Sequence, residues 1–323
     1  MAKRRSRKNK LNTSTLVATV LVAVVLIAGL VGCLFEPLSD LFSGFSSGGR
    51  GGGGGGGSSD SSDISDGSAV TVHFIDVGQA DCAVICTENG NIIIDAGMNA
   101  SEDEMKSYID KIGVKSFKYA IFTHPHEDHI GGAEVILKNY RVENVIIPDL
   151  AATTKVYNTM LDAIEETVPE ENVHVIEADE EFEFFVGSLK AKILGPVEID
   201  DDPNNASIIT KITYGKTKLL FMGDAEVKSE ELLLKKYRAS ELDADIIKLG
   251  HHGSNTSSDP DFLRAVSPNV AIISCGLDNK YGHPNAETMN TLEQQSIKYH
   301  RTDKEGTVIC TITPGGYSFK TTK

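Results

Sequence analysis

The chain has 323 residues and a formal net charge of −15, which is enough length for one large domain or two average ones. From residue 69 onward, 24 Lys or Arg stand against 41 Asp or Glu, a net charge of −17, without a cluster of basic residues. Proteins that hold nucleic acid by neutralising phosphates usually carry the opposite balance. The composition therefore argues against a general nucleic-acid-binding protein, and no strong basic patch is expected, although a nuclease is not excluded.

The first 68 residues predict a membrane attachment and a linker. Residues 3–10 hold six Lys or Arg, and residues 16–35 carry no charge. As a helix, residues 16–35 would be about 30 Å long, which is enough to cross a bilayer. A basic tail (residues 1–15) before such an anchor keeps the N-terminus in the cytoplasm and places the rest outside. Residues 36–68, which are rich in Gly, Ser and Asp, are expected to form a flexible linker.

Two kinds of attachment fit the apolar run. Residues 30–33 (LVGC) resemble a bacterial lipobox, which would mean cleavage before Cys33 and lipidation of its thiol. The run is long for a signal peptide and continues past Cys33, which favours an uncleaved anchor. With either attachment, residues 69–323 are expected to form an extracytoplasmic domain on the outer face of the membrane. Protein partners do not follow from the sequence.

Apolar strand patterns alternate with helical ones along residues 69–323. Strands are expected at 70–77, 82–86, 91–95, 119–123, 145–147, 173–176, 182–194, 207–213, 218–222, 244–249, 270–275, 306–311 and 317–320. Helices are expected at 102–112, 131–140, 153–167, 227–238, 260–266 and 285–295, with Asp259 as the N-cap of the fifth. This order predicts an α/β fold of two mixed sheets packed face to face, with helices on the outer faces.

Three of the nine histidines lie in one short stretch, residues 123–132 (THPHEDHIGG). His124 and His126 are two residues apart, so in an extended segment both can point to the same side. Asp128 and His129 follow where the chain is expected to turn into a helix. A pH switch would not need the carboxylate, and a solvated loop would not need the two glycines, which let the backbone turn sharply. The pattern favours a site for two adjacent metal ions.

This H-x-H-x-D-H pattern resembles the signature of the metallo-β-lactamase fold superfamily, whose fold is an αββα sandwich. The resemblance implies that His124 and His126 bind a first divalent metal ion, and that Asp128 and His129 bind a second. Residues expected at other strand ends complete the implied set: Asp95 orients the loop, Asp224 bridges the metals, and His251 is the last ligand of the second metal.

Within that superfamily the sequence looks most like the ComEC-type branch, the hydrolase domain of the bacterial competence DNA-uptake channel. The motifs that carry this resemblance are HFIDVGQADC (73–82), NNASII (204–209), LGHHGSNTSS (249–258), CGLDNKYGHP (275–284) and RTDKEGTV (301–308). They imply supporting or substrate-facing roles for Asp81, Asn205, Ser207, His252, Asn279 and Tyr281. The loop histidine His283 is expected to face the substrate.

One departure concerns the first metal. The superfamily usually supplies a third histidine before the bridging Asp, but the only candidate here is His174, in an alternating run typical of a strand. The ComEC-type pattern has Asn and Ser at this point (Asn204, Asn205 and Ser207). A site with more oxygen ligands is compatible with Mn²⁺ as well as Zn²⁺.

The resemblance implies a two-metal hydrolase in which Asp128 and Asp224 position the metals and His283 assists the leaving group. A phosphodiesterase or nuclease, acting on a small phosphodiester or nucleic acid, is favoured because paired cations suit displacement at phosphorus. Two alternatives stay open: a hydrolase of choline-phosphate or carboxylic esters, which the acidic charge favours, and a non-catalytic surface binding module that contains metal.

Overall fold

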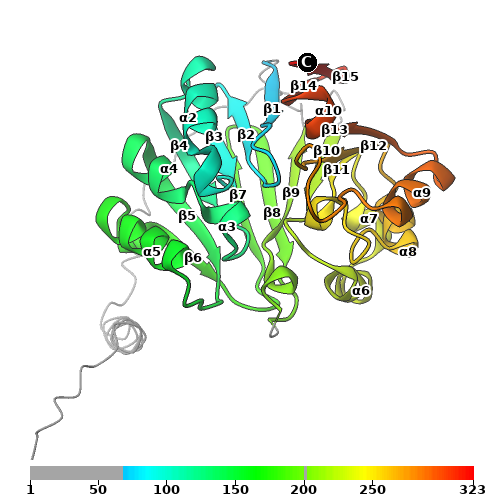
Figure 1. The fold of residues 1–323 in the computed structure, drawn as a ribbon, viewed down its shortest axis with the longest axis horizontal. Coiled ribbons are helices and arrows are strands. Elements are labelled where there is room, and N and C mark those ends of the chain that lie inside the picture. The colour runs from blue at the N-terminus through cyan, green and yellow to red at the C-terminus, as the bar shows by residue number, and fades with distance from the viewer. Residues whose placement is uncertain (1–67, 200–201) are drawn as a thin grey trace, which may run out of the picture. The chain divides into compact units, whose positions relative to one another are not determined.

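The computed structural model describes residues 68–199 and 202–323 and places their strands in two sheets (Figure 1). The first sheet has the order β15-β14-β1-β2-β3-β4-β5-β6. Its strands are β1 (Val70–Phe74), β2 (Ala83–Thr87), β3 (Gly90–Ile94), β4 (Ser116–Ile121), β5 (Arg141–Pro148), β6 (Val173–Ile176), β14 (Val308–Thr313) and β15 (Gly316–Thr321). The second sheet has the order β13-β12-β11-β10-β9-β8-β7. Its strands are β7 (Phe182–Val186), β8 (Leu189–Gly195), β9 (Ile209–Tyr214), β10 (Thr217–Phe221), β11 (Ile246–Lys248), β12 (Val270–Ile273) and β13 (Lys298–Arg301).

Helices cover the outer face of each sheet (Figure 1). Those on the first sheet are α2 (Glu102–Lys111), α3 (Glu127–Ile130), α4 (Ala133–Asn139) and α5 (Lys155–Thr167). Those on the second are α6 (Val227–Lys236), α7 (Ala239–Leu242), α8 (Pro260–Val266) and α9 (Ala286–Gln294), and the short α10 (Thr302–Glu305) follows β13. The predicted αββα sandwich of two mixed sheets is confirmed.

Both faces of each sheet are buried, as the residue pattern of β3 illustrates. Ile92 and Ile94 point into the core between the sheets, whereas Ile93 packs against the helices on the other side. Neighbouring residues of a strand face opposite sides, so a strand covered on both faces needs continuous apolar residues rather than alternation. The sandwich therefore has a central core between the sheets and one outer core under each helical layer.

Two differences from the predicted strands show where the sequence pattern fails. Residues 182–194 were expected to form one strand, but they form the antiparallel hairpin β7–β8, in which Val186 pairs with Leu189. Gly187 adopts a positive φ of 60° in the turn, a conformation that glycine adopts without strain. The strand β13 was not predicted, because its sequence KYHR contains no aliphatic residue and it lies at a sheet edge beside β12.

The membrane anchor predicted at residues 16–35 lies outside the described residues, as do the basic tail and Cys33. Within residues 68–199 and 202–323, no helix is both long enough and apolar enough to span a bilayer. In the same ranges Cys82, Cys86, Cys275 and Cys310 are free thiols.

Candidate metal centre

The predicted ligands lie at one edge of the two sheets, beyond the carboxyl ends of their strands. His124 follows β4, Asp224 follows β10, and His251 and His252 follow β11 in the 3-10 turn η4 (Gly250–Gly253). Strands β3 and β4 are parallel, and so are β10, β11 and β12. Loops after parallel strands meet at one sheet edge, which is where α/β proteins usually place a site.

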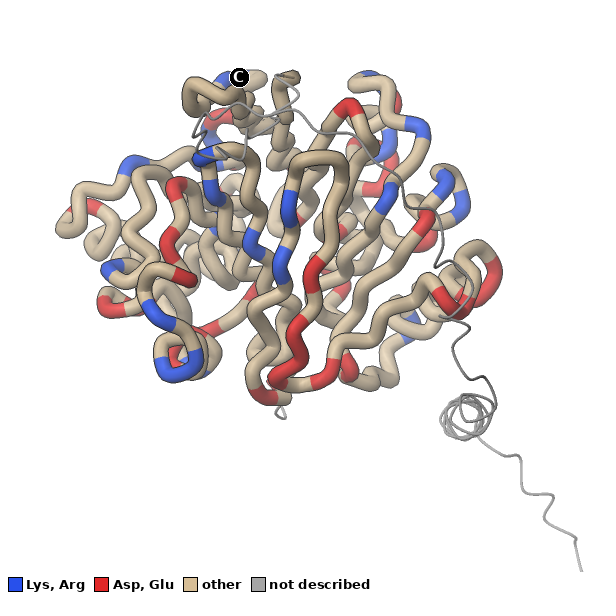
Figure 2. Tube along the Cα trace, turned by 180° about the vertical axis from the view of Figure 1, so that it is seen from behind, with Lys and Arg blue, Asp and Glu red and all other residues tan. Residues whose placement is uncertain are grey.

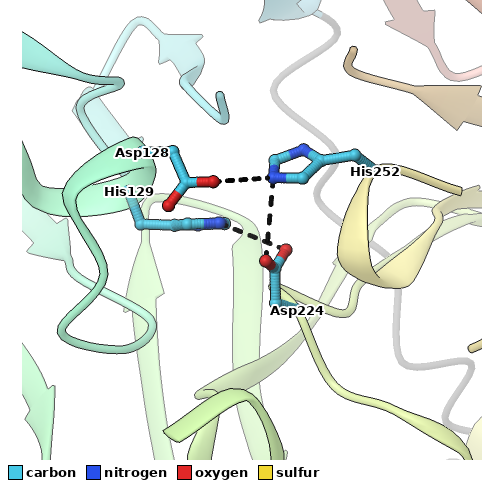
Figure 3. A group of neighbouring side chains, drawn as sticks. All are labelled: Asp128, His129, Asp224 and His252. Carbon is cyan, nitrogen blue, oxygen red and sulfur yellow. Dashed lines mark hydrogen bonds and ion pairs between the residues drawn. The ribbon is translucent and has the colours of Figure 1, made fainter. Parts of the chain in front are cut away.

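Four side chains form the tightest group, here called the four-residue cluster: Asp128, His129, Asp224 and His252 (Figure 3). One ligand atom of each lies within 4.8 Å of the others. His252 Nε2 is 3.2 Å from Asp128 Oδ2 and 3.6 Å from Asp224 Oδ2. His129 Nε2 lies 3.1 Å from Asp224 Oδ1. Two carboxylates and two imidazoles from both sheets thus converge on one point.

A second group shares Asp224 with this cluster. His124 Nε2 lies 3.1 Å from His126 Nδ1 and 3.9 Å from Asp224 Oδ2. The two imidazoles come from the loop after β4, so the spacing of two residues does bring both rings to the same side. Asp224 is a member of the four-residue cluster and also faces the pair His124 and His126. A bridging ligand needs this position.

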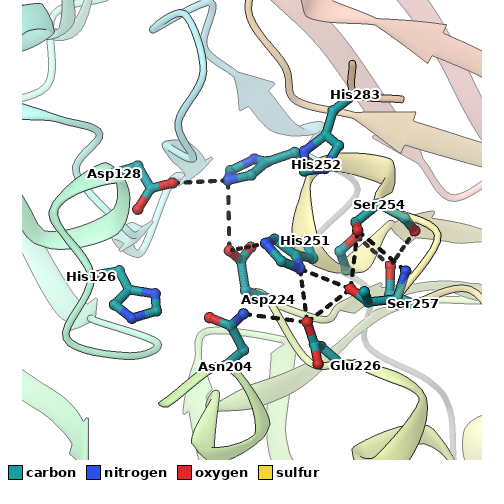
Figure 4. A network of polar contacts seen from close by, with 12 residues as sticks. His126, Asp128, Asn204, Asp224, Glu226, His251, His252, Ser254, Ser257 and His283 are labelled. Atoms are coloured by element: carbon teal, nitrogen blue, oxygen red, sulfur yellow. Dashed lines mark hydrogen bonds and ion pairs between the residues drawn. The ribbon is translucent and has the colours of Figure 1, made fainter. Parts of the chain in front are cut away.

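The two neighbouring histidines of η4 face different partners. His252 joins the four-residue cluster, whereas His251 turns its Nδ1 to Glu226 Oε1 at 3.0 Å and its Nε2 to Asp224 Oδ2 at 4.0 Å (Figure 4). Both backbones have positive φ, 47° for His251 and 54° for His252. Such conformations cost non-glycine residues on the order of 1–3 kcal/mol and often mark functional sites. His252 thus faces Asp128, as expected for His251, whereas His251 faces Glu226 and lies farther from Asp224.

The rings of the cluster are held by partners on their other nitrogens. Asp95 Oδ2 lies 2.8 Å from His129 Nδ1, and the same carboxylate accepts hydrogen bonds from the backbone and hydroxyl of Thr123. His252 Nδ1 donates to the carbonyl of Ser274 at 3.0 Å. Each contact occupies Nδ1 and directs Nε2 into the cluster, which is how proteins commonly orient metal-binding imidazoles. The predicted supporting position of Asp95 matches this geometry.

A buried ion pair lies behind the cluster. Lys248 is only 5% exposed, forms an ion pair with Asp81 Oδ2 and donates to the carbonyl of Leu249. Asp81 also lies 3.4 Å from His252 Nδ1. Burial raises the pKa of Asp81, but the positive charges of Lys248 and His252 outweigh burial and lower it. Asp81 is therefore ionised and supports the cluster through its contact with His252 Nδ1.

The carboxylates of the cluster favour positive charge on the imidazoles beside them. Burial lowers the pKa of His252, but the carboxylates of Asp224 and Asp81 outweigh burial and raise it to about 10. For His129, burial is likewise outweighed by Asp224 and Asp95, and the pKa rises well above its usual value. Burial raises the pKa of Asp224, but His129 and other imidazoles lower it well below the ordinary range. Protons on these imidazoles carry the positive charge that balances the carboxylates. Divalent cations, when bound, would neutralise the same carboxylates.

The donor set fits divalent metal ions. Within the described residues, His129 Nε2 and Asp224 Oδ1 are buried and lie 3.1 Å apart, and neither atom has another partner. A divalent cation between them would take the place of the proton that this contact needs. Imidazole nitrogens and carboxylate oxygens in a mixed set suit Zn²⁺ and Mn²⁺. The first metal ion would be held by His124, His126 and Asp224. The second would be held by Asp128, His129, Asp224 and His252.

The residues predicted beside the first metal divide into two kinds. Ser207 Oγ accepts a hydrogen bond from the backbone N–H of Asp224, and Asn205 Oδ1 accepts one from the hydroxyl of Ser229. Both side chains therefore stabilise the local conformation of the chain. Asn204 Oδ1, by contrast, is buried without a hydrogen-bond partner among the described residues, and Asn204 lines the pocket. Asn204 thus offers an oxygen that no described residue satisfies, on the wall of the cavity beside the metal-binding side chains. His174 lies on β6, 3.3 Å from Asn144 Oδ1, and does not join the site.

A cavity of about 290 Å³ opens above the metal-binding side chains. His283 and Tyr281 form part of its wall, on the loop between β12 and α9. Gln79 Oε1 accepts from the backbone of Gly276 at 3.0 Å, which leaves the Gln79 amide nitrogen to donate to His283 Nδ1 at 3.3 Å. The Nε2 atom of His283 then carries the hydrogen. Burial and the nearby His252 and His251 lower the pKa of His283 to about 4, so its ring is neutral near pH 7.

Sequence reasoning gave no role to Gln79, Lys248 or Glu226. Gln79 stands inside the quoted motif at residues 73–82, and Lys248 interrupts an otherwise apolar strand, IIKL. A lysine in a buried strand is a signal for a paired carboxylate. Glu226 had no such signal, because its contact with His251 depends on the turn after β10.

The two glycines after His129 serve close packing rather than a sharp turn. Gly131 and Gly132 have ordinary helical φ values, −54° and −82°. A Cβ on Gly132 would overlap the carbonyl oxygen of Ala96, and one on Gly131 would overlap the backbone of residues 98–99. The helical segment can therefore approach the loop after β3 only without side chains at these positions.

Comparison with known proteins agrees with this architecture. The chain is 29% identical over 256 residues to ComE operon protein 3 of Bacillus subtilis, which covers 73% of this chain and 32% of that protein. It is 31% identical over 253 residues to competence protein ComA of Neisseria gonorrhoeae, covering 77% of this chain and 33% of that protein. The chain thus spans about a third of the length of these relatives.

Among solved structures, a metallo hydrolase from the archaeon Ignicoccus hospitalis aligns with a TM-score of 0.49 at 16% identity, covering 75% of this chain and 98% of that one. Residues 75–277 match the family described as the Metallo-beta-lactamase superfamily, which is more than half of the chain. Together with the similarity to ComEC-type competence proteins, this match shows that the chain belongs to the metallo-β-lactamase superfamily.

Proposed function

We propose that the protein is a metal-dependent phosphodiesterase. Membership in the superfamily implies a metal-dependent hydrolase, and the position of Asp224 supports a site for two ions. Its Oδ2 is 3.9 Å from His124 Nε2, and its Oδ1 is 3.1 Å from His129 Nε2. Paired divalent cations, when bound, polarise a phosphoryl oxygen and activate water.

The chain itself supplies orientation and hydrogen bonding. Asp224 positions both groups of ligands, and Asp128 fixes His252 from the opposite side. His283, neutral and with its hydrogen on Nε2, donates a hydrogen bond to the leaving-group oxygen. We assign hydrogen-bond donation rather than acid catalysis to His283, because burial lowers the pKa of its ring to about 4 and the neutral ring is a weak acid.

The space around the centre supports an extended substrate. The cavity above the ligands has a volume of about 290 Å³. A second cavity, of about 740 Å³, lies over α3, α4 and α5, and His126 and Glu127 line both. A chain of linked phosphodiesters could occupy space on both sides of the bond that is cleaved. A small carboxylic or choline-phosphate ester would use only one.

Charge is expected to make substrate binding depend on metal. The cavity wall contains Glu127, Asp128 and Asp224, which repel a phosphodiester unless cations are present. Elsewhere, Lys and Arg are interspersed with Asp and Glu (Figure 2). For example, Asp243 pairs with both Lys211 and Lys218. We therefore expect bound cations, rather than a basic patch, to attract the phosphate.

A substrate screen tests the proposal. The protein, loaded with Zn²⁺ or Mn²⁺, is assayed with single-stranded DNA, RNA, bis-p-nitrophenyl phosphate, phosphocholine esters and carboxylic esters, with Asp224→Asn as the blank. We expect phosphodiester hydrolysis that falls by about 10²-fold or more in the variant, since the neutral amide bridges cations poorly. Activity confined to carboxylic or choline esters would replace the phosphodiester assignment. Metal binding without any hydrolysis would favour the surface binding module.

We further propose that residues 69–323 lie outside the cell, tethered through residues 16–35. The six basic residues before the apolar run and the similarity to competence proteins support this orientation. Protease added to intact cells should remove the folded part, and full protection would refute the orientation. A Cys33→Ser variant then separates the two anchors, because lipid labelling and altered processing depend on that thiol only in a lipoprotein.

A further inference from the structure

The loop between β12 and α9 presents an aromatic ring at the rim of the metal-binding cavity. Tyr281 is 56% exposed and lines the same cavity as Asp128 and Asp224. Its ring is stacked on that of His283, with the centroids 5.6 Å apart and the planes 26° from parallel. A single exposed aromatic residue is ordinary. Here, however, the ring is next to the side chain proposed to contact the leaving group.

The ring is held by a rigid loop. Asn279 Oδ1 accepts from the backbone of Tyr281 and of His283, and its amide nitrogen donates to the carbonyls of Gly276 and His283. Asn285 Nδ2 donates to the carbonyl of Gly282, and the Asn285 backbone donates to Gly253 in the turn that carries His252. The Tyr281 ring is thus fixed relative to the metal-binding side chains before any substrate arrives, which reduces the entropy lost on binding.

A lysine on the same loop, Lys280, favours some classes of ligand over others. Lys280 Nζ lies 4.9 Å from the centroid of the Tyr281 ring. Within the described ranges, no carboxylate forms an ion pair with Lys280. A planar group attached to a phosphate suits this pair, because Lys280 can turn from the Tyr281 ring to the phosphate and leave that face of the ring to the planar group. A quaternary ammonium such as choline would also favour an aromatic face, but Lys280 would repel it.

We propose that Tyr281 is the platform on which a nucleobase beside the scissile phosphodiester stacks, with Lys280 bound to the neighbouring phosphate. A base within a duplex has both faces covered, so the substrate is single-stranded nucleic acid or an unpaired end. This inference rests on the proposed phosphodiesterase function and specifies its substrate. It gives Tyr281 and Lys280 a role in substrate affinity, separate from metal binding.

Fluorescence tests stacking without any need for turnover. The chain contains no tryptophan, so Tyr281→Trp introduces a single reporter. With Zn²⁺ present, we expect a single-stranded oligothymidylate with phosphorothioate linkages to quench its emission. An abasic oligonucleotide of the same length and phosphocholine should leave the emission unchanged. Equal quenching by the abasic strand, or quenching by phosphocholine alone, would overturn the assignment of a base to this ring.

Kinetics then separate this inference from the proposed function. Tyr281→Ala should raise the KM for a single-stranded oligonucleotide by about tenfold, the effect typical of one lost stacking contact, with metal content unchanged. Tyr281→Phe should restore the KM, and Lys280→Gln should raise it while making it less dependent on salt. The control is Tyr299→Ala, at an exposed tyrosine on β13. An unchanged KM in Tyr281→Ala would refute stacking but leave the phosphodiesterase intact, whereas a wild-type protein without phosphodiester hydrolysis would refute the proposed function itself.

Discussion

The Nε2 atom of His124 and the Nδ1 atom of His126 lie 3.1 Å apart, with their rings at 78° to one another. Burial and the nearby His129 lower the pKa of His124 well below its usual value, so its ring is neutral. Two imidazole nitrogens can approach this closely only if one carries a hydrogen or both face a shared cation. The loop that joins them therefore holds the two nitrogens at a separation that fits either a hydrogen bond or one shared cation.

The first prediction distinguishes the two histidines of η4. His252→Ala should remove about one metal ion per chain, because His252 Nε2 faces both Asp128 and Asp224. His251→Ala should keep that ion and weaken only the ion on the side of His124. Elemental analysis after dialysis, with a titration of each metal, measures both effects. If His251→Ala loses the ion bound by Asp128 while His252→Ala does not, the order implied by the sequence resemblance is correct and our placement is wrong.

The different partners of His251 and His252 could not be predicted from the sequence. The positions of His124, Asp95 and Asp224 could be predicted because each follows a strand whose apolar residues are evident, and their expected roles came from the superfamily resemblance. Adjacent residues in a turn lack that periodicity. Positive φ at both His251 and His252 decides which ring enters the cluster, and no residue type signals this conformation when neither residue is glycine.

The fold was predictable for a similar reason, and its errors lie at edges and turns. Strands with continuous aliphatic residues, such as residues 90–94, are visible because both of their faces are buried. β13 pairs only with β12, so its polar sequence KYHR carries little of the core and leaves no apolar pattern. The α8 N-cap was correct, because the Asp259 side chain accepts from the backbone of Asp261 and Phe262.

A second prediction concerns the buried pair Lys248 and Asp81. Lys248→Met should destabilise the protein by about 3–5 kcal/mol, because it leaves the Asp81 carboxylate buried without its cation. The double variant Lys248→Met with Asp81→Asn should recover part of this loss, since both charges are then removed. Urea unfolding in EDTA measures the stability of the apo protein.

The matched control for that experiment is Lys106→Gln, which breaks an exposed ion pair with Asp110. Exposed pairs contribute at most about 1 kcal/mol, so this variant should unfold close to the wild type. Comparable losses in Lys248→Met and Lys106→Gln would show that the Lys248 charge is not buried in solution.

A third prediction concerns the hydrogen on His283. His283→Ala should lower turnover by about 10²-fold with unchanged metal content, because its partner is the substrate. Gln79→Leu should lower turnover less, because the variant loses only the hydrogen bond that keeps the hydrogen of His283 on Nε2. The double variant should be no slower than His283→Ala alone, because the two side chains act through one hydrogen bond.

His174→Ala is the control for metal content and turnover, and neither should change, because His174 lies on β6 beside Asn144. Additive losses in the double variant would show that Gln79 acts through the loop backbone and not through His283. A loss of metal in His174→Ala would identify it as the missing ligand of the first ion.

The last prediction is a pH dependence that arises away from the metal centre. Glu230 on α6 is 1% exposed, and its carboxyl accepts hydrogen bonds from the backbone of Ser258 and Asp259 at 2.7 and 2.8 Å. Burial raises its pKa from 4.5 to about 8, against the opposing effect of those two hydrogen bonds. Between these values the folded state binds a proton that the unfolded state has released. The contribution of Glu230 is thus fully present below about pH 4.5 and is lost as the pH rises through about 8.

Glu230→Gln removes this titration. Its amide nitrogen cannot accept the second backbone hydrogen bond, which lowers the unfolding free energy by the same amount at every pH. The unfolding free energy of the variant should therefore fall less steeply from pH 5 to pH 8.5 than that of the wild type. The difference between the two proteins should change by a few kcal/mol, on the order expected for a shift of this size. Urea unfolding in EDTA at each pH measures it, because every other titrating group contributes equally to both proteins. Glu231→Gln, at an exposed neighbour paired with Lys235, should give a curve parallel to the wild type. If the Glu230→Gln curve is also parallel, the carboxylate is ionised in the folded protein, and the two backbone hydrogen bonds rather than burial determine its charge.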